Sequence, residues 1–143
     1  MRIFFVLIIA LFFTTTLKSQ NQYINIPDVN FLRALIKAGV DKNNDGKIDT
    51  TEANKVTSIY IYRNKIKKLK GIEYFKNIDS LFCGFNNLKN LDISKNIKLN
   101  NIDISYNTNL KKVCVSELPF SKKNITKYND KGCSKDLKYE ICK

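Results

Sequence analysis

Apolar residues recur at a regular interval in the middle of the chain, in the pattern L-x-x-L-x-L-x-x-N-x-L, where other apolar residues can replace leucine. The units are Val56, Ile59, Ile61, Asn64 and Ile66; Ile78, Leu81, Cys83, Asn86 and Leu88; and Leu99, Ile102, Ile104, Asn107 and the displaced Leu110. A weaker signal lies half a period away, since Leu81, Leu91, Ile102 and Val113 follow one another at nearly equal spacing. Such a period is typical of stacked coils, because no single coil buries enough surface alone.

Each unit predicts a short strand and a turn. Alternate apolar side chains point inward, and the asparagine turns the chain and bonds backbone groups of neighbouring coils. The pattern therefore predicts an α/β fold: a short right-handed leucine-rich repeat solenoid with parallel β-strands over residues 56–115.

Residues 20–55 predict a helix and a loop ahead of the repeats. Pro27 and Asp28 are typical of a helix start, because proline presets the backbone and aspartate caps free amides. The helix then has one apolar face and ends at Gly39. The face consists of Phe31, Leu32, Leu35 and Ile36.

The loop at residues 41–52, DKNNDGKIDTTE, has oxygen-bearing residues at the spacing of a calcium-binding loop. The expected Ca2+ ligands are the side chains of Asp41, Asn43, Asp45, Asp49 and Glu52 and the backbone carbonyl of Lys47. Gly46 permits the sharp bend, and Ile48 points into the core. A single loop with lysines nearby and one neutral amide ligand predicts a structural site with a dissociation constant of about 0.1 to 1 mM. The alternative is a hydrophilic Asx-rich turn.

Residues 1–19 predict a secretory signal peptide. Arg2 precedes the apolar run IFFVLIIALFF and the polar segment TTTLKSQ. The run is short for a membrane span, which takes about 20 residues. We therefore expect a secreted, periplasmic or cell-surface bacterial protein that is not transmembrane after signal cleavage.

The repeats also resemble known proteins. LKGIEYFKNIDSLFCGFNNLKNL resembles the repeats of internalin-type bacterial leucine-rich repeat proteins, and LDISKNIKLNNIDISYNTNLKKVCV is similar to secreted bacterial proteins with short LDxSxN repeats. In those proteins an IPDxNF segment and an aspartate-rich loop often come first, as IPDVNF and residues 41–52 do here. The loop itself is similar to EF-hand and dockerin segments. The resemblance covers residues 24–115 and implies a binding or adhesion module.

Side chains between the inward positions of the predicted strands face outward. They are Tyr60, Tyr62, Arg63, Phe82, Gly84, Phe85, Asp103, Ser105 and Tyr106. Stacked coils place Tyr60 beside Phe82 and Phe85 beside Tyr106. Such an aromatic ladder suits a sugar or an apolar peptide, with Arg63 and Asp103 as polar handles. The alternatives are a dimer contact, or cover by the N-terminal helix or the C-terminal tail.

Three of the four cysteines, Cys114, Cys133 and Cys142, lie in the last thirty residues, and the fourth is Cys83. Export would permit disulfides, and four cysteines allow three pairings. We expect residues 116–143 to form a disulfide-held cap, with Cys114–Cys133 as the preferred pair. Zinc is disfavoured, because the spacings lack CxxC and the chain has no histidine.

The charge balance, 25 lysines and arginines against 13 aspartates and glutamates, gives a net charge of +12. This excess favours anionic partners such as acidic glycans or headgroups, although lysines spread along the chain are more typical of a solvated surface.

The absence of histidine excludes Ser-His and Cys-His pairs, and no phosphate loop is present, so we expect no enzyme. The sequence predicts a module that binds a protein or a glycan. The alternatives are a calcium-stabilised structural or self-assembling surface subunit and a polyanion-binding surface protein. No specific nucleic-acid partner is expected.

Overall fold

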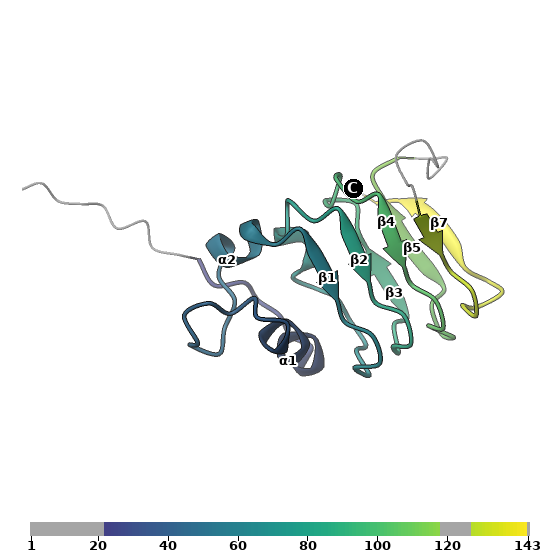
Figure 1. Cartoon of the computed structure of the whole chain (residues 1–143). Coiled ribbons are helices and arrows are strands. Elements are labelled where there is room, and N and C mark those ends of the chain that lie inside the picture. Colours follow the sequence, from purple (N-terminus) through teal and green to yellow (C-terminus); the bar gives the residue numbers. More distant parts are fainter. Residues whose placement is uncertain (1–21, 118–126, 143) are drawn as a thin grey trace, which may run out of the picture.

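The computed structural model describes residues 22–117 and 127–142, so the predicted signal peptide lies outside the described residues. Two short helices stand at one end of a stack of strands (Figure 1). In the described part of the chain, no helix is long and apolar enough to span a membrane.

Helix α1 (Val29–Lys37) is fixed to the solenoid by the residue that caps it. Asp28 accepts hydrogen bonds from the amides of Asn30 and Phe31, at 3.0 and 3.1 Å, which confirms the predicted cap. Its second carboxylate oxygen accepts hydrogen bonds from the amides of Lys67 and Lys68 in the first coil. Burial raises the pKa of Asp28, but these four backbone donors outweigh it and lower the pKa overall. A second helix, α2 (Thr50–Lys55), follows the acidic loop.

The strands form two parallel sheets, which confirms the predicted solenoid. In the described residues the first sheet has the order β1 (Ser58–Tyr60), β2 (Ser80–Phe82), β4 (Asn101–Asp103) and β6 (Lys127–Asn129). The second sheet has the order β3 (Asn90–Asp92), β5 (Lys112–Val115) and β7 (Lys138–Ile141), and β3 and β5 lie behind β2 and β4 in Figure 1.

The second sheet explains the half-period signal in the sequence. Ile59, Leu81 and Ile102 pair in register in the first sheet, and Leu91 and Val113 pair in the second. All five side chains are at most 2% exposed, so they fill a core between the two sheets. In the first coil the described chain has the short 3-10 helix η1 (Ile72–Tyr74) and adds no strand to the second sheet.

The asparagines of the second and third repeats connect neighbouring coils, as the sequence predicts, whereas the Asn64 side chain bonds the Tyr62 carbonyl of its own coil. Asn86 is 5% exposed and Asn107 is fully buried. The Asn86 side chain accepts from the amides of Asn64 and Ile66 in the preceding coil, and it donates to the carbonyls of Ile61 and Cys83. A single side chain therefore satisfies backbone groups of two coils.

The tail adds another coil to the stack beyond residue 115, where the sequence analysis ends the repeats. Strand β6 pairs with β4, and β7 pairs with β5. The repeat is hidden in the sequence because this coil is longer. The chain segment between Asp103 and its partner Asn129 is longer than the segment between Phe82 and its partner Asp103.

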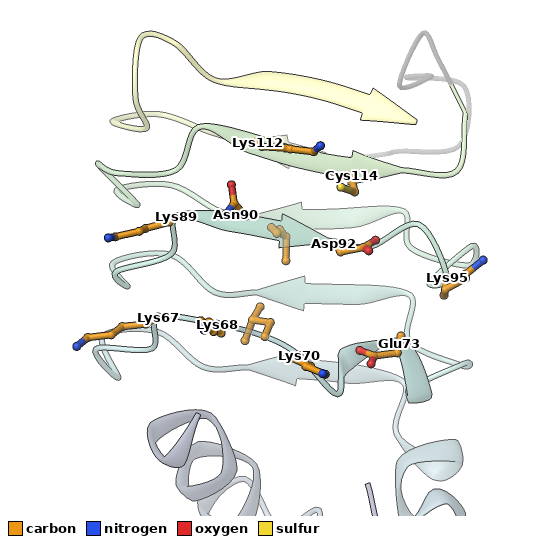
Figure 2. A pocket seen from close by; sticks show the side chains of 12 residues that line it. Lys67, Lys68, Lys70, Glu73, Lys89, Asn90, Asp92, Lys95, Lys112 and Cys114 are labelled. Atoms are coloured by element: carbon orange, nitrogen blue, oxygen red, sulfur yellow. The ribbon is translucent and has the colours of Figure 1, made fainter. Parts of the chain in front are cut away.

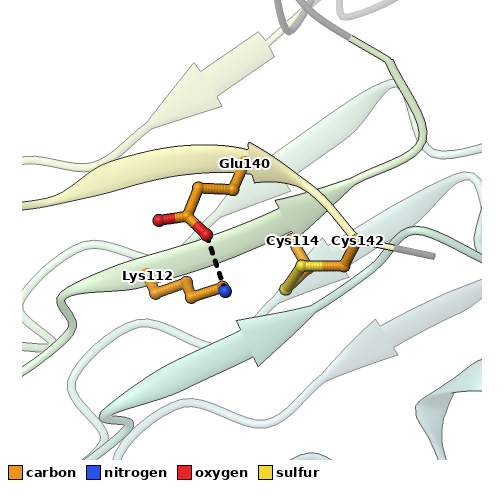
Figure 3. Close-up of polar contacts among 4 residues, drawn as sticks. All are labelled: Lys112, Cys114, Glu140 and Cys142. Carbon is orange, nitrogen blue, oxygen red and sulfur yellow. Dashed lines mark ion pairs between the residues drawn. A yellow bond between two sulfur atoms is a disulfide. The ribbon is translucent and has the colours of Figure 1, made fainter.

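The predicted disulfide Cys114–Cys133 is wrong. Cys114 is bonded to Cys142, while Cys83 and Cys133 are free. The strand register explains this pairing. Cys114 lies opposite Glu140 on the neighbouring strand, so Cys142, two residues further on, is close enough to form the bond. Figure 3 shows this bond next to the ion pair between Lys112 and Glu140, which joins the same two strands. The Cys133 thiol instead donates to the carbonyl of Ile104, with the sulfur 3.2 Å from the oxygen.

Candidate functional site

Aromatic rings stack on the outward side of the first sheet. The ring centroids of Tyr60 and Phe82 are 4.7 Å apart with planes 7° apart, and those of Phe85 and Tyr106 are 4.2 Å apart with planes 18° apart. Both pairs were expected from the stacking of coils, and both are confirmed. We call Tyr60, Tyr62, Phe82, Phe85 and Tyr106 the aromatic ladder. Four of its members are exposed, with Tyr60 62% exposed and Phe85 40% exposed, and Phe82 is half-buried.

One row of outward residues, which includes two members of the ladder, starts the turn after each strand. Arg63, Phe85 and Tyr106 occupy this place in three successive coils, all with φ near +55°. This left-handed conformation costs a residue with a side chain on the order of 1 kcal/mol. The next coil has Gly132 there, where a β-carbon would lie only 2.8 Å from the Tyr106 ring. The row therefore ends with Tyr106 packed over a glycine.

Two charged residues lie at the aromatic rings, as the sequence predicts. The Arg63 guanidinium lies 4.7 Å from the centre of the Phe85 ring, in a cation–π contact. The Tyr62 hydroxyl donates to the Asp103 carboxylate at 2.6 Å. The structure thus brings the seven predicted ligand-binding residues together in two groups. One group is Tyr60, Tyr62, Phe82 and Asp103, and the other is Arg63, Phe85 and Tyr106.

Asp103 is an ionised carboxylate at neutral pH. Burial raises its pKa, but hydrogen bonds from Ser105, Tyr62 and Asn129 lower the pKa overall. Burial and the nearby Asp103 raise the pKa of Tyr62, which is therefore a neutral phenol. The pair offers a ligand one fixed negative charge and one hydroxyl.

Two supporting residues have no role assigned in the sequence analysis. A β-carbon at Gly84 would lie 2.7 Å from Tyr62 Cε1 and 3.0 Å from Ser105 Oγ, so only glycine leaves room for the Tyr62 ring. Asn129 donates to Asp103 at 3.3 Å from the extra coil. The role of Gly84 could have been inferred from the sequence, because it is a glycine between aromatic residues at an outward position, where a neighbouring ring needs space.

The acidic loop is held by bonds from its carboxylates to backbone amides. Asp41 is buried and accepts from the amides of Asp45 and Gly46, at 3.2 and 2.9 Å. Glu52, also buried, accepts from the amides of Lys42 and Asp49, at 2.7 and 3.0 Å. Gly46 has a φ of +77°, which suits the expected bend.

The remaining predicted metal ligands make local contacts. The Asn43 side chain and the Tyr23 hydroxyl both donate to Asp45, and the Tyr23 bond is the main cause that lowers the pKa of Asp45. Asp49 accepts from the Glu52 amide and caps α2. The Lys47 ammonium lies 4.6 Å from the Tyr23 ring centre. In residues 22–117 and 127–142, no three His, Cys, Asp or Glu side chains form a group that could hold a metal ion.

The comparisons with known proteins concern mainly the fold. No protein-family model and no curated protein matches this sequence. A solved structure of the CBM51-2 and INT domains of ZmpB from Clostridium perfringens is similar, with a TM-score of 0.53, 26% identity, and 66% of this chain and 19% of that chain covered. The same domains have been solved with CBM51-2 in complex with GlcNAc.

Two internalins of Listeria monocytogenes are also similar. The functional domain of InlJ, which includes a cysteine ladder, has a TM-score of 0.53 at 23% identity, covering 87% of this chain and 29% of that chain. InlF has a TM-score of 0.48 at 24% identity, covering 70% of this chain and 34% of that chain. This chain therefore spans about a fifth to a third of the length of its structural neighbours. Its architecture is an internalin-like solenoid.

Proposed function

We propose that this chain is an exported or surface recognition module that binds a glycan or a protein through the aromatic ladder. The observation that carries the proposal is the pair of exposed aromatic stacks on one sheet face. Aromatic rings provide a large contact area with few rotatable bonds, and they are enriched among the residues that dominate binding energy. Arg63 and Asp103 add opposite charges beside these rings.

A glycan is the favoured ligand. The rings are stacked in pairs along the solenoid, so their exposed parts form an elongated apolar strip, which suits a sugar chain. The ionised Asp103 next to the Tyr62 hydroxyl can bind sugar hydroxyls. The ZmpB structure that is similar to this chain contains CBM51-2 and INT domains, and the match covers 19% of that chain, so the similarity supports a recognition module without selecting its ligand.

Binding to a glycan array and to insoluble chitin, cellulose and peptidoglycan tests this proposal. We expect Tyr60→Ala and Tyr106→Ala each to weaken binding to the recognised glycan at least about tenfold, as for central aromatic contacts. Tyr74→Ala is the matched control, because Tyr74 is 37% exposed and belongs to η1, away from the ladder. Undiminished binding by a Tyr60→Ala/Tyr106→Ala double variant would rule the ladder out.

Self-assembly is the second candidate, favoured by the large exposed fraction of Tyr60. A second copy of the chain would bury the ladder and remove this apolar surface from water. Light scattering of the same variants separates the two candidates. If the wild type forms a concentration-dependent dimer and Tyr60→Ala does not, the result supports a self-assembling subunit.

We propose further that the acidic loop binds calcium weakly and that bound calcium stabilises the packing of the N-terminal helices against the solenoid. Two buried carboxylates, Asp41 and Glu52, and the left-handed Gly46 support this proposal, as does a ligand set made of oxygen atoms, which calcium prefers. In this structure Asp41 and Glu52 accept hydrogen bonds from backbone amides of the loop, so calcium would have to replace some of these bonds.

Thermal unfolding in calcium and in chelator tests the loop. With a dissociation constant of about 0.1 to 1 mM, about 10 mM calcium should stabilise the protein by about 1.4 to 2.7 kcal/mol and raise the melting temperature by a few degrees. Asp41→Ala should abolish the shift. Asp136→Ala, which removes an exposed carboxylate from the last coil, should retain it. An equal shift in both variants, or none in the wild type, would count against the site.

A further inference from the structure

A lysine-lined groove lies on the outward side of the second sheet. It has a volume of about 810 Å³, and Leu69 and Leu91 contribute to its lining. The groove lies where the first coil adds no strand beside β3 in the described structure. Six lysines surround it: Lys67, Lys68, Lys70, Lys89, Lys95 and Lys112 (Figure 2). We call it the lysine groove.

Lysines outnumber carboxylates in the lining of the groove, six against two, so the groove carries an excess of positive charge. Its two carboxylates are engaged locally: Glu73 accepts from the Gly71 amide, and Asp92 accepts from the amide and hydroxyl of Ser94. Of its lysines, Lys112 forms an ion pair with Glu140, at 2.6 Å. Within the part of the chain that the structure describes, the other five lysines have no ion-pair partner.

Two of the lysines are aligned along the solenoid axis. Lys67 and Lys89 are one repeat period apart, and Figure 2 shows them on the same edge of the groove, with Lys95 at the opposite edge. Successive coils of a parallel sheet are about 4.8 Å apart, so Lys67 and Lys89 place positive charge at about this interval along the axis, and the other lysines add charge across the groove. A linear polymer with a negative charge on each unit complements this elongated positive surface.

We propose that the lysine groove binds a linear anionic polysaccharide that carries carboxylate or sulfate groups. The described residues that line it include no aromatic side chain, so the groove offers no stacking platform for the bases of a single-stranded nucleic acid. Its concave form suits a chain laid along the sheet better than a flat bilayer. The proposal is independent of the aromatic ladder, which lies on the other sheet.

The test uses heparin as the sulfated probe and polygalacturonate as the carboxylated probe, with neutral dextran and single-stranded DNA as comparisons. Lys67→Gln/Lys89→Gln/Lys95→Gln removes three exposed groove charges. We expect its affinity for both anionic glycans to fall at least about tenfold at low salt, and the slope of log affinity against log salt to become shallower by about 2 to 3.

The matched control, Lys37→Gln/Lys76→Gln/Lys135→Gln, removes the same charge from exposed positions that do not line the groove. It should retain affinity within about threefold, because screened charges away from a bound polymer contribute little. Equal losses in the two triple variants would show attraction to net charge alone. Such losses, tighter binding to DNA than to the glycans, or equal binding to dextran would overturn the proposal. Tyr60→Ala should leave heparin binding unchanged, which separates this proposal from the function proposed for the ladder.

Discussion

Asn86→Ala is expected to lower the free energy of unfolding by about 3 kcal/mol or more, a loss at the upper end of the range for point substitutions. The side chain is 5% exposed, and four of its hydrogen bonds to backbone groups of two coils are 2.8 to 3.1 Å long. Leaving one buried donor or acceptor unsatisfied costs about 1–3 kcal/mol. Water that enters the space of the lost amide can satisfy some of these groups, so the loss stays below the sum of four such costs.

Asn87→Ala is the matched control, since Asn87 is the next residue in the chain and is exposed. Its backbone amide donates to the Ile66 carbonyl and is unaffected by the substitution. We expect a change within about 0.5 kcal/mol, as for ordinary surface positions. Urea unfolding of both variants, analysed with a common denaturant slope, measures the difference. Similar losses in the two variants would mean that Asn86 does not connect the coils.

The repeats were predictable because their physical requirements recur at the same place in each coil. Inward positions such as Leu81 must be apolar, and a buried turn needs the donor and acceptor that asparagine provides. The outward ladder followed from the alternation of side chains along a strand. The sequence therefore predicted the contacts of Phe82 and Phe85 correctly.

The second sheet and the last coil were harder to predict. Apolar residues at the half period, such as Leu91 and Val113, show that this side of each coil is buried, but they do not show that it forms strands. The second sheet is identified only by the pairing of these residues in the structure. The last coil contains more residues than the coils before it, so a search for a repeat of constant length does not find it. The wrong disulfide has the same origin, because choosing Cys142 over Cys133 requires the register of β7 on β5.

The lysine groove was not predicted for a related reason. Lys67, Lys89 and Lys95 are scattered in the sequence and indicate a solvated surface. Folding brings them around one concavity, because residues a full period apart become neighbours in successive coils. In a solenoid, a charge pattern therefore has to be examined at the period of the repeat as well as along the chain.

Cys142→Ser is expected to lower the free energy of unfolding of the oxidised protein by about 3 to 4 kcal/mol. The bond joins residues 28 positions apart, and a closed loop of that length restricts the unfolded chain by about this amount. It also holds β7, the last strand of the second sheet in the described order, whose Ile141 is 54% exposed and gains little from burial. Without the bond this strand is held by its pairing with β5 and by the contacts of Tyr139 with the core and with Asp130.

Cys133→Ser should change stability by less than about 1 kcal/mol, because serine keeps a donor for the Ile104 carbonyl and no covalent bond is lost. The two variants therefore separate the observed pairing from Cys114–Cys133 by chemical unfolding alone. A reductant should remove the difference between wild type and Cys142→Ser, since both then lack the crosslink. A larger loss in Cys133→Ser than in Cys142→Ser would instead support the pairing expected from the sequence, and peptide mapping without reduction would identify it directly.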